Sequence, residues 1–259
     1  MCLILFSYGM HPDYRLILAA NRDEFYNRPT APLAYWTEHP DVLAGRDLKG
    51  NGTWLGVARA GRIAAVSNYR DPSTHIQDAA SRGLLVSNYL TGNLSPRQYL
   101  EAVSKIGHQY NGFNLIAGDP SGLYYYSNRA KGIRKLRPGF YGISNHLLDT
   151  PWPKVNKTKA RLRAQLMGEE KIEIEKIWST LADRSPALDK ELPDTGVGLT
   201  WERILSPVFI TSQDYGTRSS SIVMIEKSGQ ITLMERTFSN SGNEIKQGQT
   251  RNYRFKIIH

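Results

Sequence analysis

The chain has 259 residues, 40% of them hydrophobic and 22% charged, which is an ordinary globular composition with enough apolar content for a substantial core. It contains no run of about 18 apolar residues, which excludes a transmembrane helix, and its single cysteine excludes a disulfide framework. The formal net charge is +9.

This charge lies in one segment. Residues 129–163 hold ten basic side chains and one acidic side chain, Asp149, whereas the rest of the chain has equal numbers of both signs. Half of the ten fall on a predicted helix, where a solvated face is the ordinary explanation. The segment contains no nucleic-acid-binding motif, so we expect no nucleic-acid partner.

Predicted strands come in hairpins. At the N-terminus, MCLILFSY and YRLILAAN flank a His-Pro-Asp turn, and because both runs are apolar on both faces they should lie in the middle of a covered sheet. Later hairpins are predicted at TWLGVARA with RIAAVSNY, FNLIAGD with LYYYSNR, and SSSIVMIEK with QITLMERTF, and YRFKII is the last predicted strand.

Helices are predicted between the strands. They cover residues 81–91, 95–106 with Ser95 as N-cap, 153–167, and 171–183 after a break at Gly168. Residues 184–200 contain Pro and Gly and are predicted to be a loop. This order favours an α+β architecture of antiparallel sheets with helices on their faces, in a single domain spanning 1–259. The N-terminus lacks a secretory signal, so we expect a cytoplasmic protein.

Cys2 directly follows the initiator methionine. Removal of Met1, which is usual before small side chains, would leave Cys2 with a free α-amine. Such an amine titrates near pH ~7.7–8.0 and can act as the general base for the thiol of its own residue. Alternatively, Cys2 is a small buried apolar residue on a strand.

A polar tetrapeptide follows the second predicted strand. In a tight hairpin, Asn21, Arg22, Asp23 and Glu24 would return beside Cys2. A carboxylate there can hold the α-ammonium, and Arg22 can stabilise a thiolate or bind an anionic substrate group. The alternative is a solvated polar turn.

Further polar positions lie at strand ends. Asn68 in SNYR and Asn145 in GISNH can donate to a developing oxyanion or cap a turn, and Arg218 lies in the polar strand entry YGTRSSS. The glycine-rich stretch 44–56 is interpreted as a turn that serves backbone geometry, because no strand–turn–helix context supports nucleotide binding. The histidines have no ligand spacing, and we expect no metal.

Four blocks in order resemble the NRDE family, which includes the Transport and Golgi organisation protein 2 group. These blocks are MCLI at the start, AANRDE at 19–24, AGRDLKGNGTWLG at 44–56 and SNHLLDTPWPKV at 144–155. The resemblance covers essentially the whole chain. It implies a four-layer αββα sandwich related to N-terminal nucleophile hydrolases, such as the choloylglycine and penicillin acylases, which cleave or transfer acyl groups at amide bonds.

The resemblance also implies residue roles. Cys2 occupies the nucleophile position, and Arg22 and Asp23 match an active-site Arg and Asp in type, although their spacing is compressed and Glu24 competes for the Asp role. Asn145 resembles an oxyanion-binding or amine-holding Asn. Late in the chain, Arg218 resembles an active-site Arg, and it joins Asn21, Glu24 and Asn68 as candidate substrate-binding residues.

Two functions follow as hypotheses. The first is a cysteine amidohydrolase or acyltransferase acting on a small acylated or anionic metabolite without a required cofactor. The second, implied by the family's links to haem movement and lipid or acyl-CoA metabolism, is a non-catalytic binding and trafficking protein that holds haem or acyl-CoA non-covalently. For either, residues 129–163 are predicted to form an anion-attracting rim beside the Cys2 pocket, without membrane insertion.

Overall fold

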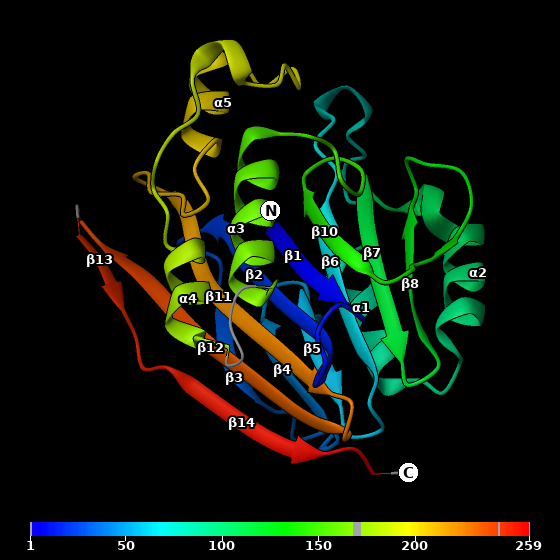
Figure 1. Cartoon of the computed structure of the whole chain (residues 1–259). Coiled ribbons are helices and arrows are strands. Elements are labelled where there is room, and N and C mark those ends of the chain that lie inside the picture. The colour runs from blue at the N-terminus through cyan, green and yellow to red at the C-terminus, as the bar shows by residue number, and fades with distance from the viewer. Residues whose placement is uncertain (1, 168–171, 243, 259) are drawn as a thin grey trace.

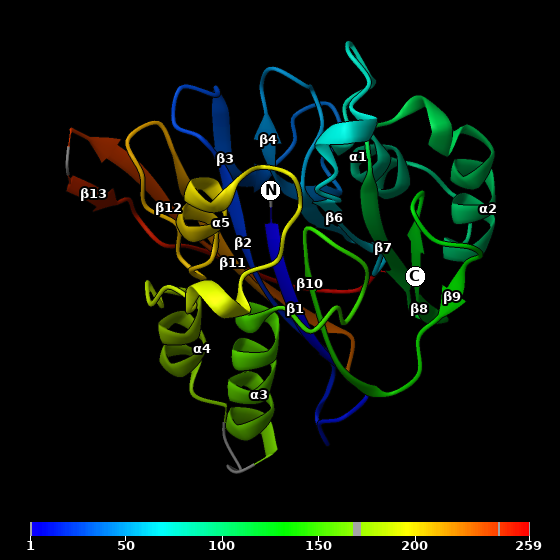
Figure 2. The same ribbon diagram turned by 90° about the horizontal axis from the view of Figure 1, so that it is seen from above.

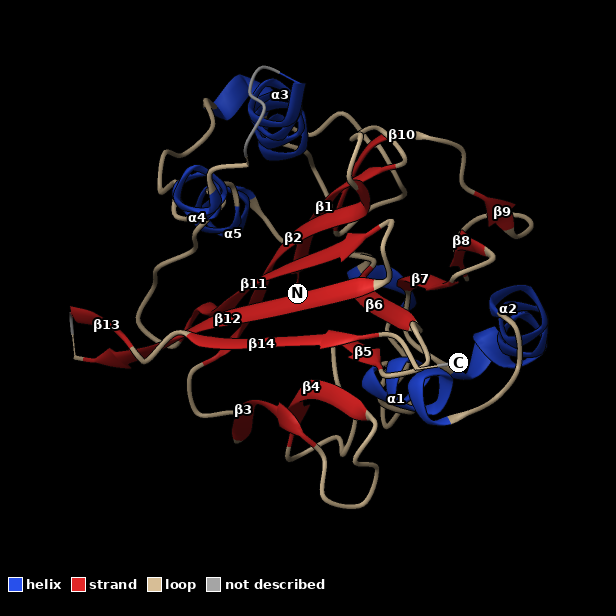
Figure 3. Cartoon of the chain, turned by 60° about the horizontal axis from the view of Figure 1, so that its bottom comes forward, coloured by secondary structure: helices blue, strands red, loops and turns tan. Residues whose placement is uncertain are grey.

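The structure, a computed structural model, describes residues 2–167, 172–242 and 244–258 (Figure 1). These residues form two antiparallel sheets that pack face to face, with helices on both outer faces (Figure 3). The four-layer αββα sandwich of the α+β class is therefore confirmed.

The first sheet carries the N-terminal hairpin at its centre. Its spatial order is β10 (Gly139–Ser144), β1 (Cys2–Tyr8), β2 (Tyr14–Phe25), β11 (Tyr215–Glu226), β12 (Gln230–Ser241) and β13 (Glu244–Gln247), and β14 (Arg251–Lys256) also pairs with β12. The central position of β1 and β2 is the one predicted from their apolar runs.

The second sheet follows chain order. It consists of β3 (Thr30–Tyr35), β4 (Val42–Asp47), β5 (Leu55–Ala58), β6 (Ile63–Asn68), β7 (Phe113–Asp119), β8 (Gly122–Ser127) and β9 (Arg134–Lys135). Neighbouring strands along the chain are neighbours in the sheet, as the predicted hairpins require.

Helices cover the outer faces. Their bounds are α1 (Gly83–Thr91), α2 (Pro96–Ile106), α3 (Pro153–Met167), α4 (Ile174–Leu181) and α5 (Leu199–Leu205), with short 3₁₀ turns at Pro72–Thr74, Gly107–Gln109 and Asp189–Glu191. The α1 and α2 helices pack on the second sheet, and α3 and α4 pack on the first. Ser95 caps α2 through a reciprocal capping box with Gln98, as its sequence predicted.

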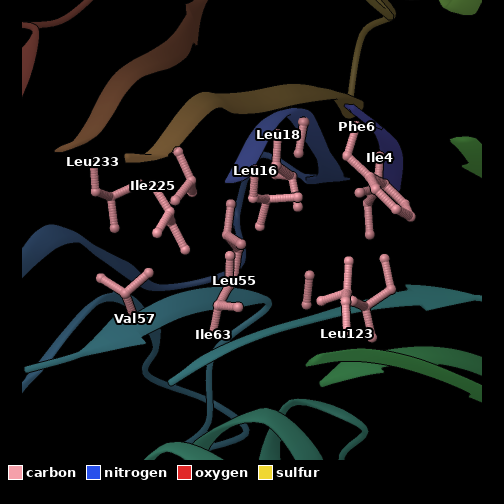
Figure 4. Close-up of a cluster of buried hydrophobic side chains, with 14 of the residues drawn as sticks. Ile4, Phe6, Leu16, Leu18, Leu55, Val57, Ile63, Leu123, Ile225 and Leu233 are labelled. Carbon is pink, nitrogen blue, oxygen red and sulfur yellow. The ribbon is translucent and has the colours of Figure 1, made fainter. Parts of the chain in front are cut away.

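The main core lies between the sheets. Alternate residues of β1 and β2 point inward, and Figure 4 shows them meeting side chains of the second sheet; the cluster includes Ile4, Phe6, Leu16, Leu18, Leu55, Val57 and Ile63. Leu3 and Ile17 lie on the other face of the same strands and pack with Leu162 of α3 and Ile177 of α4. Burying each such side chain contributes roughly 1.5–3 kcal/mol.

Some elements differ from the prediction. The β3 and β4 strands were not predicted. Pro32 interrupts the sequence pattern of β3, and in β4 Gly45 is followed by the charged residues Arg46 and Asp47. The predicted helix 171–183 is α4, starting at Ile174, and the predicted break at Gly168 lies outside the described residues. Within the predicted loop 184–200 there is a 3₁₀ turn, and α5 begins at Leu199.

Candidate active site

The candidate site lies where β1 begins and β2 ends. Cys2 pairs with Arg22 across the β1–β2 ladder, and on the other side of β1, Leu3 pairs with Ser144. Asn145 follows that pair, so the backbone of Cys2 lies between the strand positions of Arg22 and Asn145. The β1–β2 hairpin therefore brings Arg22 beside Cys2 as expected, and the β1–β10 pairing brings Asn145 to the same end of β1. Met1 lies outside the described residues, and its removal stays a prediction.

Arg22 is the buried cation of this site. Its side chain is 5% exposed, its guanidinium lies 4.3 Å from the ring centroid of Trp54, and its Nη1 donates to Thr30 Oγ1 at 3.2 Å. No acidic side chain of the described residues lies within ion-pair distance of Arg22. A buried guanidinium held in this way can bind an anionic group with little competition from the protein.

A cavity of 330 Å³, here called cavity 1, opens beside Arg22. Its charged lining consists of Arg22, Glu24, Arg28, Asp47, Lys49 and Arg82, four basic and two acidic side chains. Both acidic residues engage Arg28: Asp47 accepts from its Nη2 at 2.7 Å, and Glu24 lies 3.7 Å from its Nε. The net lining charge is therefore positive, and Asn68 also lines this cavity.

The glycine-rich stretch 44–56 shapes cavity 1. A Cβ on Gly45 would lie 2.5 Å from the Trp54 ring, so glycine there leaves the space that the ring needs to stack on Arg22. A Cβ on Gly52 would lie 2.3 Å from the backbone of Gly83, at the start of α1. The structural interpretation of this motif thus holds for both glycines, and the same motif supplies Trp54 to the cavity wall.

Gly52→Ala is expected to destabilise the fold by about 1–3 kcal/mol, because two backbone segments must separate to admit the methyl group. Thermal unfolding measures this as a fall of roughly 2–4 °C in Tm per kcal/mol. Gly122→Ala is the matched control, since the nearest atom there is the flexible end of the Lys135 side chain at 3.1 Å. Equal Tm values for the two variants would contradict the close-approach argument.

Asp23 points away from Arg22, as neighbouring residues of a strand do. Its carboxylate is 1% exposed and accepts from Thr217 Oγ1 at 2.7 Å. Burial raises the pKa of Asp23, and the positive charge of Lys154 partly offsets that rise. Glu24 instead lies on the cavity 1 side with Arg28. The two candidate carboxylates are therefore in different environments, one buried and one on a cavity rim.

Lys154 was missed as a site residue. It was predicted to belong to a solvated helical face or to an anion-attracting rim, but its side chain is buried and its Nζ donates to the carbonyl of Leu205 at 2.7 Å. Nothing in the helical pattern of α3 distinguishes it from Lys157, which is exposed and pairs with Asp183 at 2.7 Å.

The predicted basic rim is also corrected. No residue of 129–163 belongs to the described lining of cavity 1, whose cations come from residues 22–82. Within the segment, Lys159 pairs with Asp149 at 2.8 Å, and Arg161 pairs with Asp183 at 2.5 Å. The segment's charge is thus partly neutralised on the outer helical layer.

Asn145 is held in a strained conformation beside Asn68. Its φ of +59° lies in the left-handed region, which Asn tolerates better than most residues. Its Nδ2 donates to the carbonyl of Asn68 at 3.3 Å, and its own carbonyl accepts from the Arg70 N–H at 2.8 Å. Arg70 also forms a buried ion pair with Glu202 of α5 at 2.7 Å. This pair connects Asn145 to the α5 segment, which lies at the end of the molecule where β1 begins (Figure 2).

Asn21 has a structural set of partners. Its Nδ2 donates to the carbonyls of Leu181 and Val208 at 2.8 and 2.9 Å, and its Oδ1 accepts from Ser220 Oγ at 2.6 Å. These contacts lie on the helix-covered face of β2, and the structure does not bring Asn21 to the cavities at Arg22.

Arg218 and Arg22 both line a second cavity of 230 Å³, here called cavity 2. Arg218 occupies an irregularity in the β2–β11 pairing, between Thr217 and Ser219, and such bulges re-aim a side chain. Its Nη1 donates to the carbonyls of Phe25 and Arg28 at 2.8 and 3.1 Å. Arg22 and Trp54 line both cavities.

Cavity 2 contains a carboxyl group that the sequence did not reveal. Glu235 of β12 is 2% exposed, and its Oε1 accepts from the backbone N–H of Leu33 at 2.7 Å. That N–H lies where the β3–β4 register shifts, and the carbonyl of Leu33 accepts from Arg251 Nη1 at 3.1 Å. Glu235 and Arg251, paired across β12 and β14, thus connect the two sheets.

Glu235→Gln is expected to raise stability increasingly as pH rises from about 4.5. Burial raises the pKa of Glu235 above its ordinary value of 4.5, so ionisation costs folding free energy as pH rises through the raised pKa. Gln keeps the acceptor for Leu33 and removes the charge. The difference in Tm between variant and wild type should therefore be larger at pH 8 than at pH 4. Each kcal/mol of folding free energy that ionisation costs should add roughly 2–4 °C to it. A pH-independent difference would contradict the raised pKa.

The described residues contain no cluster of three or more His, Cys, Asp or Glu side chains arranged to hold a metal ion. Among the same residues, no helix is both long and apolar enough to cross a membrane.

Comparison with solved structures defines the class of fold. An orthologue of the N-acylethanolamine-hydrolyzing acid amidase from Caenorhabditis elegans superposes with a TM-score of 0.51 at 10% identity, covering 85% of this chain and 92% of that chain. The protein has the fold of the N-terminal nucleophile hydrolases.

Comparison of sequences gives the family. The profile of Transport and Golgi organisation 2 matches residues 1–240. The Transport and Golgi organization protein 2 homolog of Bos taurus is 38% identical over 280 residues, and the Transport and Golgi organization 2 homolog of Mus musculus is 35% identical over 277, each match covering 99% of both chains. The chain belongs to the Transport and Golgi organisation 2 family.

Proposed function

We propose that this protein is a cysteine amidohydrolase or acyltransferase that uses Cys2, as the mature N-terminal residue, to accept an acyl group from an amide. One observation carries the proposal: the backbone of Cys2 lies between Arg22 and Asn145, with the buried carboxylate of Asp23 next along β2. The fold, shared with an amidase, supports the same chemistry.

The proposed reaction has two stages. The α-amine of Cys2 takes the thiol proton, and the sulfur attacks the carbonyl carbon of the amide. Asn145 and Asn68 are the candidate donors to the resulting oxyanion. The C–N bond then breaks as the α-ammonium returns a proton to the leaving amine, and a thioester remains. Water or an acceptor amine attacks this thioester, which releases the acyl group and restores the thiol.

Each charged neighbour has a role in this proposal. Asp23 holds the α-ammonium, since it is the buried carboxylate, whereas Glu24 is engaged with Arg28. Arg22 binds an anionic part of the substrate in cavity 1, whose lining carries a net positive charge. The substrate class is therefore an N-acyl compound that bears a carboxylate or phosphate.

The single cysteine makes a direct test simple. Intact mass of the purified protein reports whether Met1 has been removed, and retention of Met1 would contradict the mechanism. Incubation with p-nitrophenyl acetate should give a burst of p-nitrophenolate and a protein carrying one acetyl group. Cys2→Ala should show neither the burst nor the adduct.

The same preparations distinguish a carrier from an enzyme. If the protein is a non-catalytic carrier of haem or acyl-CoA, the wild type and Cys2→Ala should bind these ligands equally well. Neither protein should then form an acetyl adduct. Absorbance titration with haem and calorimetry with an acyl-CoA measure this binding. Saturable binding without an acetyl adduct would favour the carrier over the proposed enzyme.

A further inference from the structure

The end of β6 bonds to the two residues that follow β10. Nδ2 of Asn145 donates to the carbonyl of Asn68 at 3.3 Å, and the backbone N–H of Arg70 donates to the carbonyl of Asn145 at 2.8 Å. Between them, the hydroxyl of Tyr69 lies 2.8 Å from Nε2 of His146. Together these residues, here called the clasp, join the second sheet to the first beside cavity 1, which Asn68 lines.

The hydrogen bonds of the His146 ring fix its protonation. Oγ1 of Thr150 donates to the carbonyl of Leu147 at 2.9 Å and also lies 2.7 Å from Nδ1 of His146. Because a hydroxyl group has a single proton to donate, Nδ1 carries the hydrogen of the second contact. Nε2 of the neutral ring is then an acceptor, and the hydroxyl of Tyr69 donates to it. Burial lowers the pKa of His146, which favours this neutral form.

The His146 ring is also held by packing. Its centroid lies 4.8 Å from that of the Tyr69 ring and 5.7 Å from that of Trp152. The carbonyl of His146 accepts from Nδ2 of Asn114, which belongs to β7, at 2.9 Å. Both ring nitrogens are engaged by protein hydroxyl groups, so neither is available to move a proton for a substrate. What the ring can do instead is to position its neighbours.

Asn145 is the neighbour that needs such support. Its φ of +59° is a backbone conformation that costs free energy in residues other than glycine, and such conformations persist where surrounding contacts hold them. We propose that His146 is a positioning residue that, through Tyr69, holds Asn145 in this conformation and at a fixed distance from Asn68. Asn145 and Asn68 are the candidate oxyanion donors, so this role rests on the proposed function.

The clasp itself can be tested without catalysis, by hydrogen exchange of the Arg70 backbone N–H followed by NMR. Tyr69→Phe removes only the hydroxyl and keeps the ring contact, so each opening of the clasp breaks one hydrogen bond fewer. The exchange rate of Arg70 should therefore rise about three- to tenfold. Tyr141→Phe is the matched control on β10, because its hydroxyl donates to the carbonyl of Arg137 at 2.7 Å, and it should leave the rate unchanged. An unchanged rate in Tyr69→Phe, or an NMR signal of a protonated Nε2 in the wild type at neutral pH, would overturn the proposal.

The positioning role is tested by the burst with p-nitrophenyl acetate. Tyr69→Phe and His146→Leu should lower the acylation rate constant about three- to tenfold and leave KM unchanged, because donors to the oxyanion act in the transition state. His146→Gln keeps an acceptor for the Tyr69 hydroxyl and should restore most of the rate. A merely structural role would lower the Tm of both His146 variants without this difference in rate.

The two proposals fail in different ways. Equal acylation rates in the wild type and Tyr69→Phe would overturn the positioning role alone. Absence of a burst in the wild type would overturn the proposed function and the positioning role together, and faster Arg70 exchange in Tyr69→Phe would then leave the clasp as a structural connection between the sheets.

Discussion

Replacing Arg70 with Met is expected to lower the free energy of unfolding by about 3–5 kcal/mol. Arg70 and Glu202 are 5% and 4% exposed, so the variant leaves the carboxylate of Glu202 buried without its cation. The N–H and hydroxyl of Thr195 still donate to Glu202, at 2.9 and 2.5 Å, which favours the lower end of that range. Urea denaturation measures the loss.

Two controls make this result specific to burial. Arg70→Met combined with Glu202→Leu should recover much of the lost stability, because neither charge then remains buried alone. Arg97→Met breaks a pair on the exposed surface of α2, where the two side chains are 72% and 49% exposed, and should leave the unfolding midpoint unchanged. A double variant no more stable than Arg70→Met would contradict the unpaired-charge explanation.

Arg70→Met should also affect the candidate active site at Asn145. Arg70 Nη2 lies 3.4 Å from Asn145 Oδ1, and Glu202 connects Arg70 to α5. The pair therefore joins a residue after β10 to a segment more than fifty residues later. Residues 184–200 were predicted to be a loop from their Pro and Gly content, and no local pattern in α5 indicates that Glu202 is a buried acid. Ion pairs between distant segments depend on tertiary packing, which local periodicity does not encode.

Local signals were sufficient for much of the fold. The apolar runs of β1 and β2 placed them at the centre of a sheet, and Ser95 with Pro96 marked the start of α2. The β3 and β4 strands were missed because Pro32 and the register shift near it remove the alternation that identifies a strand. At this register shift, the backbone N–H and carbonyl of Leu33 bond to the side chains of Glu235 and Arg251, which lie about two hundred residues later in the chain.

The site could be predicted where one hairpin builds it. A tight β1–β2 hairpin requires Arg22 to return beside Cys2, so that pairing followed from the spacing. The other side chains around the site come from elsewhere in the chain: Trp54 directly precedes β5 of the second sheet, and Lys154 comes from α3. Burial distinguishes Lys154 from the other lysines of its helix, and burial depends on which side of α3 meets the sheet.

Asp23→Asn is expected to lower the alkylation rate of Cys2 by iodoacetamide at pH 7 on the order of tenfold. In the proposed site the Asp23 carboxylate holds the α-ammonium beside the thiolate. Without it, the pKa of the thiol should return toward its ordinary value of about 8.5, where only a few per cent is thiolate at pH 7. Intact mass after timed alkylation measures the rate, and the midpoint of its pH profile should move upward.

Thermal unfolding of Asp23→Asn separates this effect on the thiol from a loss of the fold. Burial raises the pKa of Asp23, so ionisation of Asp23 costs folding free energy as pH rises, and Asn removes that cost. Asn also leaves the buried ammonium of Lys154 without this carboxylate, so the two effects on stability oppose each other, and the variant should stay folded while its thiol reacts more slowly. Thr217→Val removes the hydrogen bond to Asp23 but keeps the carboxylate. Its alkylation rate should therefore lie between those of the wild type and Asp23→Asn. Fast alkylation in Asp23→Asn would mean that Asp23 does not hold the amine, whereas slow alkylation in a folded protein would support that role.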